Sequence, residues 1–476
     1  MKRRLATLRA ATVAALAAAA TALPGSFAGA QVPAAAPATS GPATAAAPGR
    51  TAPATPAALG DALLFAMADA AGGLELWRAD AAGGSPRRLK DIRPGTEGSY
   101  PSGFTRLGDA LLFTANDGSS GLELWRTDGT EAGTRRVADL NAGTADSLPN
   151  AMVAFGNRLI FSADDGRHGF ELWSSTGDEA GTRLLADLNP GAGGSAPRGF
   201  TVVGERLFFI ADDGRHGAEL WTSDGSAAGT RRVKDIRPGP AASQPQQLVA
   251  LGGRLFFVAD DGRHGPELWT SDGTEAGTRL VGDLRPGPAG AGPRYLTAMG
   301  DALYFAADDG RQGVELWSAD ADGRRLRQVA DIAPGPAHAV PSHLTAVGGM
   351  LYFSANDGLH GAELWATDGR REGTRLVADL QPGPQPSAPS RLQAHQGRLL
   401  FAALSPGLGH ELHASDGTAA GTRLLADLNP GPAGSFPHDY VAVGGQLFFV
   451  ADGPGGLTAL WRLDAQGTVL PVGSPP

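Results

Sequence analysis

Histidine and aspartate recur together in four segments of the form DG(R/L)HG, and these residue types could carry chemistry. The histidines are His168, His216, His264 and His360, and three of them follow an arginine, namely Arg167, Arg215 and Arg263. An imidazole beside a guanidinium can contact a sugar hydroxyl or an acidic group. We interpret these seven residues as ligand-binding candidates, although we favour the alternative that they are solvated turn residues.

Six turns also present an aspartate before a glycine, with a glutamate six residues later. The aspartates are Asp117, Asp165, Asp213, Asp261, Asp309 and Asp357. Hard oxygen ligands around a turn could hold Ca²⁺, the only cofactor that we consider, but the spacing differs from the DxDxDG loop. The alternative is an Asx-stabilised turn in which the glutamate pairs with an arginine of a neighbouring repeat.

A histidine group occurs near residue 410, where the segment "SPGLGHELHASDGT" departs from its counterparts. It comprises His395, His410, His413 and His438. Histidines can bind a metal, but His410 and His413 are three apart on an expected strand and should face opposite sides. We favour decay of one redundant repeat over a metal site.

Standard catalytic signatures are missing from the sequence. It contains no G-x-S-x-G, no H-E-x-x-H and no P-loop, and "GAGGSA" (191–196) resembles a dinucleotide fingerprint only superficially. There are no cysteines, which excludes a cysteine nucleophile, thiolate metal ligands and disulfides.

All these residues belong to a repeat with a step of 48 residues. Glu-Leu-Trp begins at Glu75 and returns at each step to Glu363, followed by Glu-Leu-His at Glu411 and Ala-Leu-Trp at Ala459. We count nine units, and all eight tryptophans share one slot. Residues that recur in every unit are expected to form the scaffold, because a single active site requires asymmetry.

One unit, residues 248–287, predicts four short strands. "LVAL", "RLFFVAD", "ELWTS" and "RLVGDL" are separated by glycine-containing turns, and "RPGPAGAGP" leads to the next unit. "RLFFVAD" is apolar on both faces and should be covered on both sides. Four strands per unit predict an all-β fold of β-propeller blades. We favour one nine-bladed ring over two smaller propellers or an open array.

The consensus ELWxxDGTxxGTxxVxDLxPG resembles the bacterial ELWxxDGT repeat family. Two segments match it closely, "ELWRTDGTEAGTRRVADLNAG" (123–143) and "ELWTSDGTEAGTRLVGDLRPG" (267–287). The resemblance covers about nine-tenths of the chain. It implies export and a repeat architecture, and it supplies no catalytic residues.

The N-terminal segment predicts export. Residues 1–30 combine "MKRR", a short apolar stretch and an "AGA" cleavage site, so we expect a signal peptide that is cleaved after Ala30. Residues 31–56, rich in Ala, Pro and Thr, are expected to form a disordered linker, and 57–476 the repeat domain. Cleavage removes four basic residues and no acids, which moves the formal charge from −9 to −13.

The acidic mature chain argues against nucleic-acid binding, and no later segment could span a bilayer. We expect an extracellular or periplasmic monomer that acts as a non-catalytic binding or scaffold module. Its expected partner is a cell-envelope component, polysaccharide or surface protein. One alternative is an extracellular hydrolase or lyase with its site at the central funnel, and another is a structural surface or adhesion component.

Overall fold

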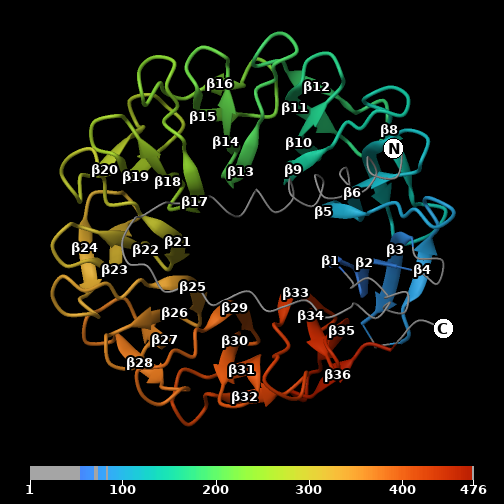
Figure 1. Cartoon of the computed structure of the whole chain (residues 1–476). Helices are drawn as coiled ribbons and strands as arrows, with labels where there is room; N and C mark the ends of the chain where they lie inside the picture. The colour runs from blue at the N-terminus through green and yellow to red at the C-terminus, as the bar shows by residue number, and fades with distance from the viewer. Residues whose placement is uncertain (1–53, 69–72, 82–83, 474–476) are drawn as a thin grey trace, which may run out of the picture. The chain divides into compact units, whose positions relative to one another are not determined.

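The computed structural model describes residues 54–68, 73–81 and 84–473, which belong to one compact unit. This part of the chain consists of 36 β-strands in nine four-stranded antiparallel sheets. The nine sheets form a closed ring (Figure 1), which confirms the prediction of one nine-bladed β-propeller over two smaller rings or an open array.

The strands follow one another blade by blade. Their bounds are β1 Ala54–Leu59, β2 Ala62–Ala68, β3 Leu74–Asp80 and β4 Arg87–Lys90; β5 Ser102–Leu107, β6 Ala110–Asn116, β7 Leu122–Thr127 and β8 Arg135–Ala138; β9 Asn150–Phe155, β10 Arg158–Asp164, β11 Phe170–Ser175 and β12 Arg183–Ala186; β13 Arg198–Val203, β14 Arg206–Asp212, β15 Ala218–Ser223 and β16 Arg231–Arg232; β17 Gln246–Leu251, β18 Arg254–Asp260, β19 Pro266–Ser271 and β20 Arg279–Gly282; β21 Arg294–Met299, β22 Ala302–Asp308, β23 Val314–Asp320 and β24 Leu326–Ala330; β25 Ser342–Val347, β26 Met350–Asn356, β27 Ala362–Thr367 and β28 Arg375–Ala378; β29 Ser390–His395, β30 Arg398–Ser405, β31 Gly409–Ser415 and β32 Arg423–Ala426; β33 His438–Val443, β34 Gln446–Gly453, β35 Leu457–Leu463 and β36 Val469–Pro471.

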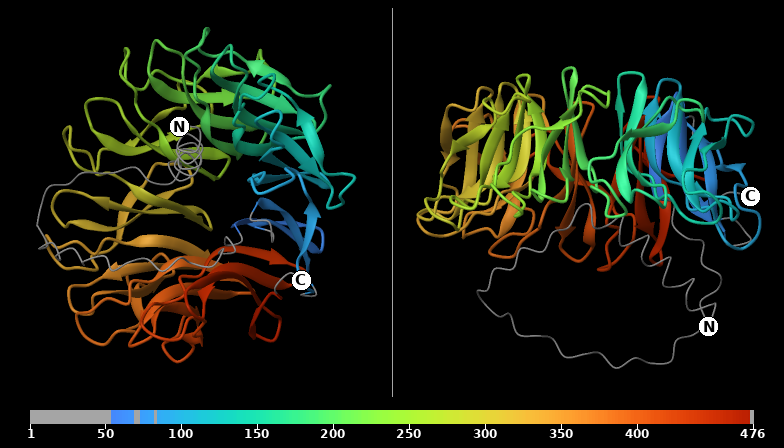
Figure 2. Two further views of the ribbon diagram at one scale, coloured as in Figure 1. Left: turned by 45° about the vertical axis from the view of Figure 1, so that its right-hand side comes forward. Right: turned by 90° about the horizontal axis from the view of Figure 1, so that it is seen from above.

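Within each blade the first strand lies innermost and the fourth outermost (Figure 1). We call the nine first strands the inner wall: β1, β5, β9, β13, β17, β21, β25, β29 and β33. Seen edge-on in the right-hand view of Figure 2, the sheets stand side by side, so each sheet face meets a neighbouring blade.

The fifth blade illustrates why the repeat folds in this way. Gly252 and Gly253 both have positive φ (58° and 73°), which the tight hairpin between β17 and β18 requires. The middle residues of β18 are buried, as predicted for a strand covered on both faces. In the next turn, Asp272 accepts hydrogen bonds from the backbone and hydroxyl of Thr274 at 2.9 and 2.7 Å, which confirms the predicted role of this turn in the scaffold.

The hydrophobic core is divided into nine clusters, one at each junction between blades. Between blades four and five, for example, Phe208 and Leu220 pack with Phe257 and Trp269. The tryptophan therefore fills the space between adjacent blades, as its fixed slot predicts.

Blade nine closes on blade one through such a cluster. Phe65 and Trp77 pack with Phe448 and Leu460. Each blade takes its four strands from one continuous segment, so the ring closes by packing between blades and not by a shared strand.

Arginines of the outermost strands join successive blades. Each guanidinium donates to the carbonyl of a turn glycine in the next blade, at 2.7–3.0 Å. The pairs are Arg231–Gly273, Arg279–Gly323, Arg327–Gly369 and Arg375–Gly417. These repeated residues therefore belong to the scaffold.

The predicted signal peptide, residues 1–30, lies outside the described residues, as does most of the predicted linker. The first blade begins at Ala54, three residues before the predicted boundary. In the described part of the chain, no helix has the length and apolar character needed to span a membrane.

Candidate functional site

The four predicted histidines are held in their own turns. The Nδ1 atom of His168 lies 2.8 Å from the Oδ2 atom of Asp165, whose Oδ1 atom accepts the backbone N–H groups of Arg167 and His168 at 2.9 Å. This geometry recurs at His216, His264 and His360. The bond to aspartate raises the pKa of His168, His264 and His360.

These turns lie beside the connections between blades, as predicted, because the backbone of Gly169 closely approaches that of Gly194. The three arginines of the set, Arg167, Arg215 and Arg263, are exposed. The structure places the seven candidates along a rim in blades three, four, five and seven, with each histidine engaged by its own aspartate.

The six predicted calcium ligands act as turn-forming acceptors. At Asp117, burial opposes ionisation, but hydrogen bonds from the backbone and side chains of Ser119 and Ser120 lower the pKa to about 2. Asp165, Asp213, Asp261, Asp309 and Asp357 accept the equivalent backbone N–H groups. Among the described residues, no three His, Asp or Glu side chains form a group that could hold a metal ion.

The glutamate of each repeat has a role that the sequence reasoning missed. Glu171 is fully buried, and its carboxylate accepts bonds from the hydroxyl of Ser195 at 2.6 Å and the backbone N–H of Leu188 at 2.9 Å. The expected pairing with an arginine of a neighbouring blade is therefore wrong. The glutamate fixes the connection to the next blade. The sequence signal for this role was a serine that recurs 24 residues after the glutamate.

Burial raises the pKa of these glutamates, both where the serine is present, as at Glu123, and where it is missing. In blades five and six an alanine stands at the serine position, as Ala291 and Ala339. Burial raises the pKa of Glu267 and Glu315 to about 7 in these blades. The Oε2 atom of Glu267 is buried and has no hydrogen-bond partner in the described structure.

The histidine group of blade eight does not assemble into a metal site. His413 occupies the tryptophan slot with 1% exposure, stacks on Phe401 and lies 3.0 Å from Ser405 Oγ through its Nε2 atom. Burial lowers the pKa of His413, which therefore acts as a neutral core residue. His410 stacks instead on Phe436, in agreement with the predicted opposite faces.

The other two members lie apart from this pair. His395 is half-buried at the end of β29, and burial lowers its pKa. The Nδ1 atom of His438 lies 3.0 Å from the carbonyl oxygen of Phe436.

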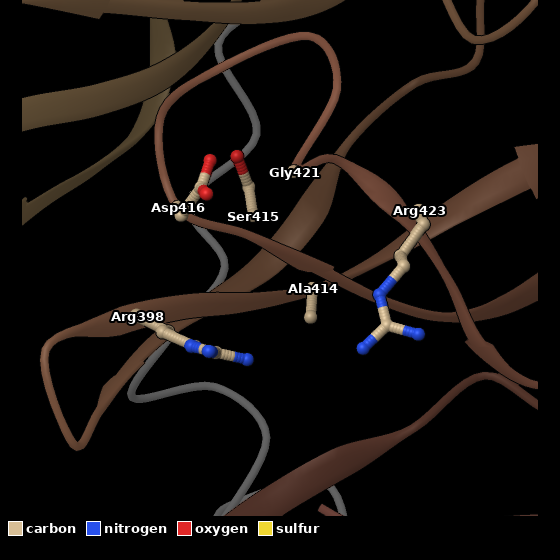
Figure 3. Close-up of a pocket in the computed structure, with 6 residues that line it drawn as sticks. All are labelled: Arg398, Ala414, Ser415, Asp416, Gly421 and Arg423. Atoms are coloured by element: carbon tan, nitrogen blue, oxygen red, sulfur yellow. The ribbon is translucent and has the colours of Figure 1, made fainter.

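The described structure includes two shallow cavities. One, of about 160 Å³, lies in blade eight, where Arg398 and Arg423 point from opposite sides toward the space over Ala414 (Figure 3). The other, of about 260 Å³, lies on the inner wall and is lined by Pro56, Gly103, Phe104, Thr105 and Met152. Neither cavity borders Ser405 or His413.

The strongest departure from ninefold repetition lies on the inner wall. In blades two to nine the second residue of the first strand has a φ of 49–68° and coincides with a register shift, and we call it the bulge position. The residues there are Gly103, Ala151, Gly199, Gln247, Tyr295, His343, Arg391 and Asp439. Blades two to four thus carry Gly or Ala, whereas blades five to nine carry five different functional side chains.

This conformation favours glycine, since other residues incur about 1–2 kcal/mol of strain in the left-handed region. We call Gln247, Tyr295, His343, Arg391 and Asp439 the inner arc. The sequence reasoning missed it because φ is not visible in a sequence. The available signal was one position of the repeat that carries Gly or Ala in units two to four and larger residues in units five to nine.

The inner arc contacts the next blade in blades five and six. Gln247 donates to the carbonyl of Pro293 in blade six at 3.1 Å, and the rings of Tyr295 and His343 lie 5.9 Å apart. Desolvation by the surrounding protein lowers the pKa of His343, and the nearby positive charge of Arg391 lowers it further. His343 is therefore neutral at pH 7 and can donate or accept a hydrogen bond.

The inner wall is basic, although the chain is acidic. Its charged residues in the described structure are Arg106, Arg198, Arg294, Arg391 and a single acid, Asp439. The full chain has a formal charge of −9. Two of the four arginines, Arg294 and Arg391, lie in blades of the inner arc.

Comparisons with known proteins add little to this geometry. Neither protein-family models nor curated proteins give a match. Among solved structures, a puromycin hydrolase has a TM-score of 0.39 at 16% identity over 78% of this chain and 60% of that chain. A prolyl endopeptidase has a TM-score of 0.41 at 14% identity, over 75% of this chain and 54% of that chain. The Niastella koreensis GH74 enzyme has a TM-score of 0.34 at 11% identity, over 86% of this chain and 71% of that chain.

The chain therefore spans less than two thirds of the puromycin hydrolase and the prolyl endopeptidase. Similarity at this level does not indicate a shared activity.

Proposed function

We propose that this protein is an exported, non-catalytic binding module for a cell-envelope component, and that it is a member of the ELWxxDGT repeat family. The observation that carries the proposal is the contrast between the repeated residues and the inner arc. Repeated His, Glu and Arg side chains bond to their own turns, to interblade connections or to the next blade. The inner arc instead presents diverse side chains on an exposed wall.

A binding role agrees with this contrast between internally bonded repeated residues and a varied inner arc. A scaffold whose repeated polar groups are internally paired holds its surface in place without using those groups for recognition. The predicted signal peptide favours a partner outside the cytoplasm, such as an envelope polysaccharide or a surface protein.

Co-sedimentation with insoluble cell-envelope material tests this proposal. The mature protein, from Gln31 onward, would be mixed with the material, and the supernatant would be assayed for released products. We expect the protein in the pellet and no soluble products. Soluble products would indicate a hydrolase or lyase, and protein that stays in the supernatant would contradict binding.

A further inference from the structure

The backbone of the inner arc points to a function beyond folding. Glycine fits the bulge position without strain, as Gly103 and Gly199 demonstrate in blades two and four. Five consecutive blades nevertheless keep larger residues, with φ values of 53–58°. Non-glycine residues with positive φ also recur three positions before the bulge, as at Leu148 and Phe436. The inner arc differs from them because its backbone strain coincides with five different functional side chains along the inner wall.

The chemistry of the arc fits a sugar chain. Tyr295 is 41% exposed and offers an aromatic ring, beside which His343 lies on the next blade. The carboxylate of Asp439 lies on the same row of strands, whereas the amide of Gln247 bonds to the backbone of blade six. An exposed aromatic ring with several hydrogen-bonding groups around it is suited to the apolar face and the hydroxyl groups of a pyranose.

The charge of the arc indicates that the sugar is acidic. Arg391 and the neighbouring Arg294 are exposed, and neither forms a hydrogen bond or ion pair with the described residues. An unpaired guanidinium presents a planar fork that matches a carboxylate. Only one acid, Asp439, opposes the four arginines of the inner wall.

We propose that the inner arc binds a uronic-acid polysaccharide, with a sugar ring against Tyr295 and a carboxylate paired with Arg391. This inference rests on the proposed binding function and specifies its site and ligand class. The ligand would run along the inner wall across blades five to nine.

Glycine substitutions test the site without endangering the fold. Tyr295→Gly and Arg391→Gly remove side chains at positions whose φ suits glycine, so the Tm should stay constant or rise. Ala151→Gly is the matched control, because it makes the same backbone change on the opposite arc. Binding to polygalacturonate and to hyaluronate would be measured by isothermal titration calorimetry, with the neutral cellohexaose as reference.

We expect at least tenfold weaker binding of an acidic polymer to Tyr295→Gly and Arg391→Gly, and unchanged binding to Ala151→Gly. The affinity of the unsubstituted protein should fall as NaCl increases. Equal affinities across the three variants would overturn the inference, as would binding to cellohexaose alone or to none of the probes. If envelope material still pelleted the protein in those cases, the proposed function would stand and only this site or ligand class would fail.

Discussion

Replacing Ala291 by serine should stabilise blade five, because it supplies a hydrogen bond that six other blades possess. In those blades the serine hydroxyl lies 2.5–2.8 Å from the glutamate Oε2 atom. In blade five the Oε2 atom of Glu267 has no such partner in the described structure, and burial raises the pKa of Glu267 to about 7.

The expected size follows from the pKa. Raising it from 4.5 to about 7 means that ionised Glu267 costs the folded state about 3 kcal/mol at pH 8. A hydrogen bond to a charged group contributes about 1.5–3 kcal/mol, so Ala291→Ser should raise the free energy of unfolding by about 2 kcal/mol. With an unfolding entropy of about 2 cal/mol/K per residue, the Tm should rise by about 2 °C if the ring unfolds as one unit.

Calorimetry at pH 5 and pH 8 would measure this effect. The gain should be larger at pH 8, where Glu267 is ionised, than at pH 5, where it is protonated. Ala289→Ser adds a hydroxyl at an exposed position of the same connection and should change nothing, whereas Ser147→Ala should destabilise blade two. No gain at pH 8, or the same gain at both pH values, would refute the assigned role of the glutamate.

Three further predictions concern the pH dependence of stability, the calcium hypothesis and the hydrolase alternative. The Tm should fall between pH 5 and pH 8, because burial raises the pKa of Glu123, Glu267 and Glu315 to about 7. In this range the folded state keeps protons that unfolded glutamates, with a pKa near 4.5, have released. The free energy of unfolding therefore decreases as the pH rises through this window. A Tm that rises instead would contradict the assignment. EGTA should leave the Tm unchanged, because the turn carboxylates, such as that of Asp117, already accept backbone N–H groups; a lower Tm would restore the calcium hypothesis. A fluorophosphonate probe should not label Ser405, since the imidazole beside it, that of His413, is a core residue with 1% exposure. Labelling detected by mass spectrometry would favour the hydrolase.

The repeat made the architecture predictable from sequence. A fixed step of 48 residues, glycine turns and strands that are apolar on both faces together imply blades that need neighbours on both sides. The tryptophan slot indicated where adjacent blades meet. The phase was also readable, because the first unit begins with its first strand and the last ends with its fourth.

The functional features were harder to predict because they depend on tertiary contacts and backbone angles. Glu171 was expected to pair with an arginine of a neighbouring repeat, yet it is buried and bonds to residues that follow it by 17 and 24 positions. Tyr295 and His343 are ordinary strand residues by type, and only their positive φ reveals that the scaffold there favours glycine. Repetition in the sequence singles out the turn histidines, which share one residue type and one slot. It does not single out the bulge position, where the residue type changes from blade to blade.

The most direct test of the central claim compares envelope binding by the protein and by a variant that lacks three of the five inner arc side chains. The variant Tyr295→Gly, His343→Gly, Arg391→Gly should remain in the supernatant after sedimentation with insoluble envelope material and should keep its Tm. The unsubstituted protein and Ala151→Gly should both pellet. A folded triple variant that pellets as fully as the unsubstituted protein would contradict recognition by the inner arc.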